Sequence, residues 1–213
     1  MSLNGCIVTI DAMGCQTKII KDIVAQEADY VITLKQNQSS LYKRVEDVFK
    51  QALMNEYQGY NYSNYRLRTQ EHDCSETRYY EILSNIQELV DPEGKWEKLN
   101  SVGRVDYLRV KANGKSSLER RYYISSLPND AELLAKAIRG HWNIENQLHW
   151  VLDVQFSEDG SRIRKDNAPQ NLAIIRQIAL NLLNQDKTIK AGIKTKRKRA
   201  GWDNNYLLKV LLS

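Results

Sequence analysis

The feature that most constrains the fold is a pattern of strand, helix and strand within the first 35 residues. Residues 6–10 (CIVTI) and 29–35 (DYVITLK) are short apolar runs rich in β-branched side chains, which is typical of buried strands. Residues 18–27 between them place apolar side chains at the spacing of one helix face. Strands joined by a crossover helix are parallel neighbours, so the pattern predicts an α/β fold that begins with a parallel pair.

Polar residues follow each of these predicted strands. Asp11 comes directly after the first strand, and Lys35 and Asn37 come at the end of the second. The carboxyl ends of parallel strands meet at one edge of a sheet, where α/β folds place ligands and catalytic groups. We therefore expect Asp11 to be a functional carboxylate. Lys35 and Asn37 either contact DNA phosphate beside it or simply end the strand.

The middle of the chain predicts an antiparallel block. A helix capped by Ser39 or Ser40 is expected to extend to about residue 53, and the polar and aromatic residues 57–65 indicate a loop. Three strand-like runs follow, with turn sequences between them, at residues 76–83, 101–110 and 119–124. Consecutive strands joined by turns pair in an antiparallel manner.

The last third of the chain predicts helices. Asn129 or Asp130 is expected to cap a helix from residue 131 to about residue 153. A second helix is expected to begin near residue 168, and a last short one to cover residues 204–212.

The first of these helices carries His141, Glu145 and His149, which are spaced by four residues and therefore lie along one face. Two imidazoles and a carboxylate suggest zinc, but the HExxH arrangement of zinc hydrolases is absent. Glu145 and Asp11 could instead share a divalent cation, because carboxylates suit Mg²⁺ and two such ions support phosphoryl transfer. A structural polar face with two unrelated acids fits the same spacing.

Cations gather toward the C-terminus of a chain whose formal net charge is +5. One basic patch follows the long helix, and a second crowds residues 187–199. Such clusters bind the phosphate backbone of DNA or form a solvated surface. The candidate DNA contacts are Lys35, Asn37, Arg162, Arg164, Lys194, Lys196, Arg197, Lys198 and Arg199.

Cysteine usage and hydropathy indicate the compartment. The three cysteines form no CxxC pair, and no apolar run approaches the length of a membrane span. The sequence therefore predicts free thiols in a reducing cytoplasm and no membrane partner.

Four stretches carry a resemblance to a known family. They read VTIDAMGCQ, ADYVITLKQNQ, GHWNIENQLHWVLDVQFSEDGSRIRKDNAPQNLAIIRQIALNLL and KTKRKRAGWDNNYLLKVL. From about residue 5 to residue 212, the chain resembles the bacterial insertion-sequence transposases of the H-repeat-associated type. The resemblance implies a DDE transposase, in which an RNase H-like domain uses Asp, Asp and Glu to hold two Mg²⁺ ions for DNA strand cleavage and joining.

By position, the resemblance makes Asp11 the second catalytic Asp and Glu145 the catalytic Glu, each a metal ligand. It implies a cytoplasmic, nucleoid-associated protein whose partner is double-stranded DNA, both insertion-sequence ends and target, and it leaves a homo-oligomer open. It also implies four regions. These are the second half of the RNase H-like core (1–56), a β-rich insertion (57–127), helices closing the catalytic core (128–186) and a basic C-terminal segment with a short helix (187–213).

Three departures from the family pattern bear on activity. Ile138, His141 and Leu152 stand where the wider class carries Tyr, Arg and Lys, and residues 72–78 lack the Gly and the first Arg of a family stretch. The first catalytic Asp of the family lies upstream of the position that Asp11 matches. The sequence therefore predicts an RNase H-like fold that is incomplete at the N-terminus, in a weakly active or inactive transposase fragment. The alternative is a non-catalytic DNA-binding remnant or a regulator of full-length transposase.

Overall fold

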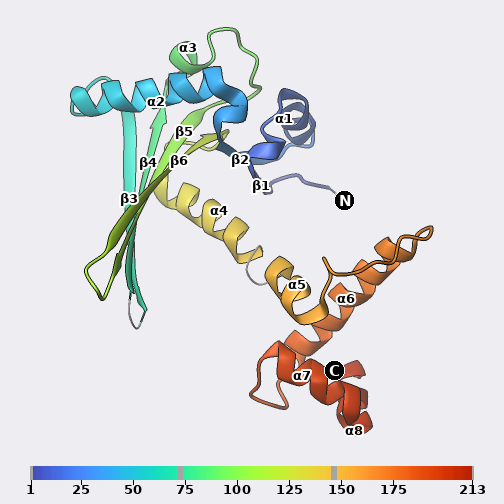
Figure 1. The fold of residues 1–213 in the computed structure, drawn as a ribbon. Helices are drawn as coiled ribbons and strands as arrows, with labels where there is room; N and C mark the ends of the chain where they lie inside the picture. Colours follow the sequence, from blue (N-terminus) through green and yellow to red (C-terminus); the bar gives the residue numbers. More distant parts are fainter. Residues whose placement is uncertain (1, 72–73, 145–147, 213) are drawn as a thin grey trace. The chain divides into compact units, whose positions relative to one another are not determined.

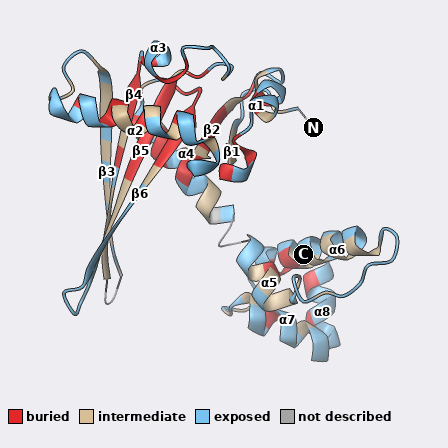
Figure 2. Cartoon of the chain, turned by 45° about the horizontal axis from the view of Figure 1, so that its top comes forward, coloured by how far each residue is buried: buried red, intermediate tan, exposed pale blue. Residues whose placement is uncertain are grey.

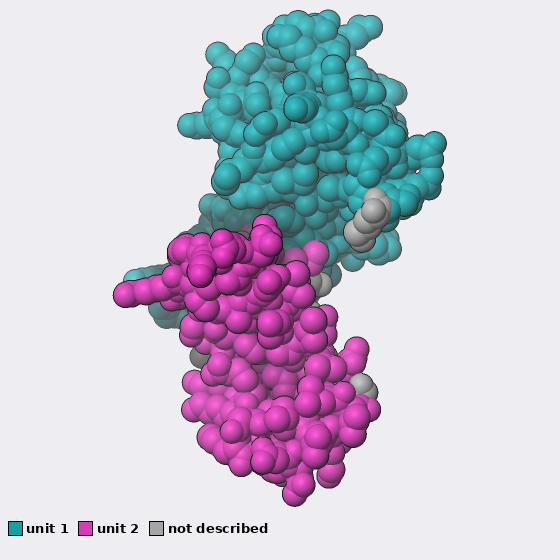
Figure 3. All heavy atoms as spheres, turned by 90° about the vertical axis from the view of Figure 1, so that its right-hand side faces the viewer, with its two compact units in different colours: residues 1–141 teal, residues 142–213 magenta. Residues whose placement is uncertain are grey.

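The computed structural model describes residues 2–71, 74–144 and 148–212. The chain forms two compact units, Met1–His141 and Trp142–Ser213, which are coloured separately in Figure 3. Each unit is described by itself. No helix among the described residues is long and apolar enough to cross a membrane.

Unit 1 is built on a six-stranded mixed sheet with the order β1-β2-β6-β5-β4-β3 (Figure 1). The β1 and β2 strands are parallel, with Ile7 opposite Asp29, whereas every other neighbouring pair is antiparallel. The predicted strand, helix and strand pattern is thus confirmed. The strands are β1 (Ile7–Ile10), β2 (Asp29–Leu34), β3 (Asn61–Glu71), β4 (Cys74–Ser84), β5 (Ser101–Lys111) and β6 (Ser116–Ser125).

Helices cover both faces of this sheet. They are α1 (Thr17–Val24), α2 (Ser39–Met54), α3 (Gln87–Val90) and α4 (Ala131–Ile144), together with the short 3₁₀ helices η1 (Ala12–Gly14) and η2 (Gln36–Gln38). The Phe49 ring of α2 packs beside Tyr122 of β6, with ring centroids 5.8 Å apart. On α4, Leu134 lies against Gly103 of β5, which pairs with Tyr123. Successive residues of a strand point to opposite faces, so α2 and α4 lie on opposite faces of the sheet.

The core lies where these helices cover the strands. Figure 2 shows buried residues gathered at that end of the sheet, while the far ends of β3 to β6 are exposed. In β5 the first five residues are buried and the last three are exposed. The long hairpins therefore extend beyond the helical layers.

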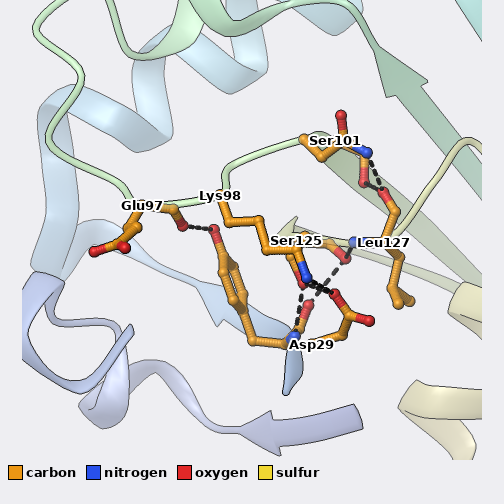
Figure 4. Close-up of polar contacts among 9 residues, drawn as sticks. Asp29, Glu97, Lys98, Ser101, Ser125 and Leu127 are labelled. Carbon is orange, nitrogen blue, oxygen red and sulfur yellow. Dashed lines mark hydrogen bonds and ion pairs between the residues drawn. The ribbon is translucent and has the colours of Figure 1, made fainter. Parts of the chain in front are cut away.

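A polar cluster holds β2 to the end of β6 (Figure 4). The Ser125 hydroxyl donates to the carbonyl oxygen of Tyr30 at 3.0 Å and accepts from the N–H of Leu127 at 2.9 Å. Lys98 Nζ donates to Asp29 Oδ1 at 2.8 Å at the same end of β2. The bonds of Ser125 satisfy buried polar groups where the antiparallel strands return to the parallel pair, whereas the Lys98–Asp29 pair is exposed.

Two local predictions were wrong in unit 1. Residues 61–65, which we expected in a loop, form the start of β3. Their polar and aromatic composition suits a loop as well as a strand, and pairing with β4 makes them a strand. Neither Ser39 nor Ser40 caps α2. The N-cap residue is Gln38, and its side chain makes no capping hydrogen bond to the helix. The predicted cap of α4 is confirmed at Asp130, because Oδ1 accepts from the N–H groups of Glu132 and Leu133 at 2.9 Å each.

Unit 2 consists of helices. They are α5 (Trp150–Phe156), α6 (Ala168–Gln185), α7 (Ile193–Trp202) and α8 (Asn204–Leu211), and Leu183, Tyr206 and Val210 form a buried core cluster. The helices predicted near residue 168 and over residues 204–212 are confirmed. The helix predicted over residues 131–153 corresponds to α4 and α5, with residues 145–147 outside the described part. The basic stretch contains a helix, α7, which was not predicted from the sequence.

Candidate functional site

The candidate site lies at the shared edge of β1 and β2. Asp11 directly follows β1, and Lys35 directly follows β2. Parallel pairing places Ile10 opposite Ile32, so the two strands end side by side. Lys35 Nζ lies 3.4 Å from Asp11 Oδ1, and both side chains remain more than half exposed. The predicted proximity of these two residues is confirmed.

Asn37 is also at this edge, where it holds the turn that follows Asp11. Its Nδ2 donates to the carbonyl oxygen of Ala12 at 2.7 Å. The neighbouring Gln38 makes a similar bond, from Nε2 to the carbonyl oxygen of Cys15 at 2.8 Å. These amides fix the backbone of η1 and thereby the position of the Asp11 carboxylate. A DNA contact by Asn37 stays a prediction.

A third polar side chain reaches the site from α4. Nδ1 of His141 lies 3.2 Å from Oγ1 of Thr9, which is on β1 two residues before Asp11. The helical spacing of the sequence predicted a helix face for His141 but no role beside Asp11. Only the packing of α4 against the sheet brings together residues that are 132 positions apart.

The surroundings of Asp11 favour its ionised form. The nearby backbone N–H of Ala12 is the main cause that holds the pKa of Asp11 below its ordinary value, and the positive charges of Lys35 and His141 add to it. Partial burial opposes this effect. Asp11 is therefore a carboxylate at neutral pH, with oxygens of the kind that Mg²⁺ prefers.

The second predicted metal ligand, Glu145, lies outside the described residues. Within the part of the chain that the structure describes, no group of three His, Cys, Asp or Glu side chains could hold a metal ion. Asp11 fits the role of one hard oxygen ligand, on an exposed edge that a hydrated cation can reach.

The predicted DNA-contact residues of unit 2 fall into two groups. Most of them are exposed, on α7 and in the segment that precedes α6: Arg162, Arg164, Lys194, Arg197, Lys198 and Arg199. Lys196 differs because it is buried, with Nζ donating to the carbonyl oxygen of Leu183 at 3.0 Å and lying 3.8 Å from the Asp186 carboxylate. This geometry gives Lys196 a structural role within unit 2.

Known proteins are similar to this chain over nearly its whole length. The family model described as "Transposase DDE domain" matches residues 1–182. The chain is 41% identical over 216 residues to "Putative transposase YncI" of Escherichia coli O157:H7 and 38% identical over 214 residues to "H repeat-associated putative transposase YhhI" of Escherichia coli strain K12. These alignments cover 100% and 99% of this chain, and 54% and 56% of the relatives. The chain thus spans about half the length of the curated relatives that it matches, and it belongs to the transposase DDE domain family.

Proposed function

We propose that this chain serves DNA transposition as the Mg²⁺-dependent domain of a DDE transposase. The observation that carries the proposal is the ionised Asp11 carboxylate at the edge shared by β1 and β2, in a chain of the transposase DDE domain family. The β1 and β2 pair would form part of an RNase H-like core. Its partners would be insertion-sequence ends and target DNA.

In this proposal, Asp11 and Glu145 supply carboxylate ligands to Mg²⁺. The bound metal would activate the attacking oxygen and stabilise the leaving oxygen in strand cleavage and in strand transfer. Asn37 acts on the site through the backbone, because its bond to Ala12 holds the turn that carries Asp11. Lys35 would leave its exposed ion pair with Asp11 at little cost and contact a DNA phosphate.

The test measures cleavage of a labelled DNA duplex that carries insertion-sequence ends, with Mg²⁺ or Mn²⁺, by the chain and by Asp11→Asn. Asp22→Asn on α1 is the matched control, because Asp22 is also an exposed aspartate of unit 1. Because the sequence predicts a weakly active or inactive fragment, we expect at most weak metal-dependent cleavage, which Asp11→Asn abolishes and Asp22→Asn leaves unchanged. Cleavage that survives Asp11→Asn would contradict the assignment of Asp11 as a metal ligand.

A second candidate function is DNA binding without catalysis, either as a regulator of full-length transposase or as a remnant. The exposed cations of α7 favour it, since they could neutralise backbone phosphates: Lys194, Arg197, Lys198 and Arg199. Fluorescence anisotropy with a labelled duplex over a range of salt concentrations tests this candidate. Affinity should fall steeply with salt, and replacing these four residues by Gln should flatten the dependence by roughly one unit of slope for each phosphate that the variant no longer neutralises.

The matched control replaces four exposed lysines of α1 and α2 by Gln: Lys18, Lys21, Lys43 and Lys50. It removes the same charge from the chain, so an equal change in slope would mean that net charge, and not α7, governs binding. Metal dependence separates the two functions. A catalytic site requires Mg²⁺, whereas α7 would bind DNA without it.

A further inference from the structure

Trp202, the last residue of α7, has an unusually exposed side chain. It is 74% exposed, although tryptophan is highly buried on average in folded proteins. Its backbone is nevertheless held in place, because the next residue, Asp203, caps α8 by accepting the N–H of Tyr206 at 3.0 Å. Asp203 also accepts from Nε of Arg199 at 3.3 Å, so its charge is compensated. A fixed helix end therefore presents a large aromatic side chain to solvent.

Two exposed lysines of α7 lie on the same face of the helix as this indole. Lys194, Lys198 and Trp202 are spaced by four residues, so each is a neighbour of the next, about 6 Å further along the helix axis. We call these three residues the α7 row. It combines two ammonium groups with one aromatic ring.

The other exposed cations of α7 also contact aromatic rings of unit 2. The guanidinium of Arg197 lies 5.5 Å from the ring centroid of Phe156, and that of Arg199 lies 5.0 Å from the ring centroid of Tyr206. The lysines of the α7 row differ, because neither has an ion pair or a side-chain hydrogen bond with another residue in the described ranges. Their ammonium groups can bind a ligand without breaking a contact within unit 2.

The α7 row suits a ligand that combines anionic groups with a flat apolar surface. Ammonium groups neutralise phosphates, and an exposed indole offers a face on which a nucleic-acid base can stack. In an intact duplex, neighbouring base pairs cover these base faces everywhere except at the ends. A strand with unpaired bases offers both its phosphates and its base faces. A duplex would therefore engage the lysines alone, whereas an unpaired strand would engage the whole row.

We propose that the α7 row binds an unpaired stretch of a DNA strand, with Lys194 and Lys198 on its phosphates and one base stacked on Trp202. The inference rests on the DNA binding proposed above for α7, and it names the form of DNA that this helix prefers. The match to the transposase DDE domain family ends at residue 182, before α7 begins, so family membership assigns this helix no role. The competing explanation is that Trp202 contacts a protein partner, since tryptophan often dominates such interfaces.

The test compares the binding of a labelled single strand of mixed sequence with that of a duplex long enough for its ends to contribute little. The full chain is used with a chelator, so that no metal site contributes. We expect Trp202→Leu to weaken single-strand binding roughly tenfold, as the loss of one base–aromatic stack predicts. Trp202→Phe should stay within about threefold of the parent, because the Phe ring still stacks on a base. Both variants should bind the duplex as the parent does.

The matched control is Trp150→Leu, because Trp150 is an exposed tryptophan of α5 that lies outside the α7 row. It should change the affinity for neither form of DNA. Equal affinities of Trp202→Leu and Trp202→Phe for the single strand would overturn the inference, and so would an equal loss of affinity for the duplex. A chain that binds the duplex but shows no dependence on Trp202 would overturn the inference and leave the proposed DNA binding standing. A chain that binds neither form at low salt would overturn both.

Salt dependence separates the two lysines from the indole. The logarithm of single-strand affinity falls with the logarithm of salt concentration, with a slope of about 0.7 for each neutralised phosphate. Lys194→Gln and Lys198→Gln should each reduce the slope by about this amount. Trp202→Leu should lower the affinity at every salt concentration and leave the slope unchanged. A change of slope in Trp202→Leu would contradict stacking as the role of Trp202.

A last measurement follows the indole itself. The chain contains four tryptophans, and a base stacked on one of them quenches its fluorescence. Adding the single strand should quench the emission of the parent and leave that of Trp202→Phe unchanged, although this variant still binds. Quenching that persists in Trp202→Phe would overturn the placement of a base on Trp202.

Discussion

Lys35 Nζ and Asp11 Oδ1 lie 3.4 Å apart, at the ends of two parallel strands. Both side chains are about 60% exposed, so water and salt screen the pair, and it contributes little to stability. The parallel pairing of β1 with β2 brings the two residues together, and the ion pair follows from that pairing. The consequence for function is an ionised carboxylate with the exposed ammonium group of Lys35 beside it.

Replacing Lys35 by Met should raise the pKa of Asp11 only partway toward its ordinary value. Lys35 is one of the causes that lower it, but the N–H of Ala12 is the larger one and remains. Carboxyl ¹³C NMR over a pH titration measures this shift, and the difference from the parent should shrink at high salt. Lys43→Met, which removes an exposed lysine of α2, should leave the pKa of Asp11 unchanged.

Glu81 holds a buried polar cluster between α2 and the sheet. Its Oε1 accepts from the hydroxyls of Tyr57 and Tyr62 at 2.6 and 3.0 Å, and its Oε2 accepts from Nε of the buried Arg104 at 2.6 Å. Glu81→Gln leaves a buried guanidinium group without a counter-charge, so it should lower the free energy of unfolding by about 3 kcal/mol. Urea unfolding measures the change.

The matched control is Glu88→Gln, because Glu88 is an exposed glutamate of α3. It should change the free energy of unfolding by less than about 0.5 kcal/mol. Equal effects of the two substitutions would show that the Glu81 cluster contributes no more than a surface residue.

Gly103 of β5 allows α4 to approach the sheet. A Cβ atom at this position would lie 2.7 Å from Cδ2 of the fully buried Leu134. Gly103→Ala should therefore lower the free energy of unfolding by about 1–2 kcal/mol, as overpacking of a core does. Thermal unfolding followed by circular dichroism measures the change.

The comparison is Gly140→Ala, on α4, the helix that packs against Gly103. A Cβ atom there would have no atom within 4 Å, so the substitution should raise the stability of the helix by up to about 1 kcal/mol. Opposite signs for the two substitutions support the close approach at Gly103. A stabilising effect of Gly103→Ala would contradict it.

Asp186 should make unit 2 less stable at acid pH. The hydrogen bonds from Thr188 and from the hydroxyl of Tyr206, together with the charge of Lys196, lower the pKa of Asp186 to about 2. A carboxyl whose pKa is lower in the folded state stabilises the fold above its unfolded pKa of about 4. This contribution is lost as the pH falls from about 4 to about 2.

We expect unit 2 to become less stable over that pH range. The NMR signals of its folded state, such as those of Tyr206 and Val210, measure this loss. Asp186→Asn should remove this part of the pH dependence and lower stability at neutral pH. Asp159→Asn, at an exposed aspartate of unit 2, should keep the dependence of the parent. A parent whose unit 2 is equally stable at pH 2 and pH 4 would rule out the role of Asp186.

Cys15 should be unreactive in the folded protein. Its side chain is fully buried, and burial raises the pKa of the thiol to about 11, so very little thiolate exists near neutral pH. Iodoacetamide at pH 8, followed by peptide mass spectrometry, should label the exposed Cys6 first and Cys15 only after unfolding in urea. Equal labelling rates in the native protein would contradict the burial of Cys15.

The sequence by itself determined the parallel pair and the edge that carries Asp11 and Lys35. Short β-branched runs around an amphipathic helix are local signals, and residues 11–28 between the strands supply the crossover helix that a parallel pair requires. The cap of α4 at Asp130 was predictable for the same reason, because a cap bonds to backbone groups two and three residues away.

The tertiary structure decided everything that depends on residues far apart in the chain. The β3 strand became visible only through its pairing with β4, because its polar and aromatic residues suit a loop as well as an exposed strand. Lys196 looked like its basic neighbours until packing buried it against Leu183 and Asp186. His141 reaches Thr9 because α4 packs on the sheet, and no local pattern encodes a contact across 132 positions. Local propensity specifies elements, whereas long-range packing chooses which of their side chains meet.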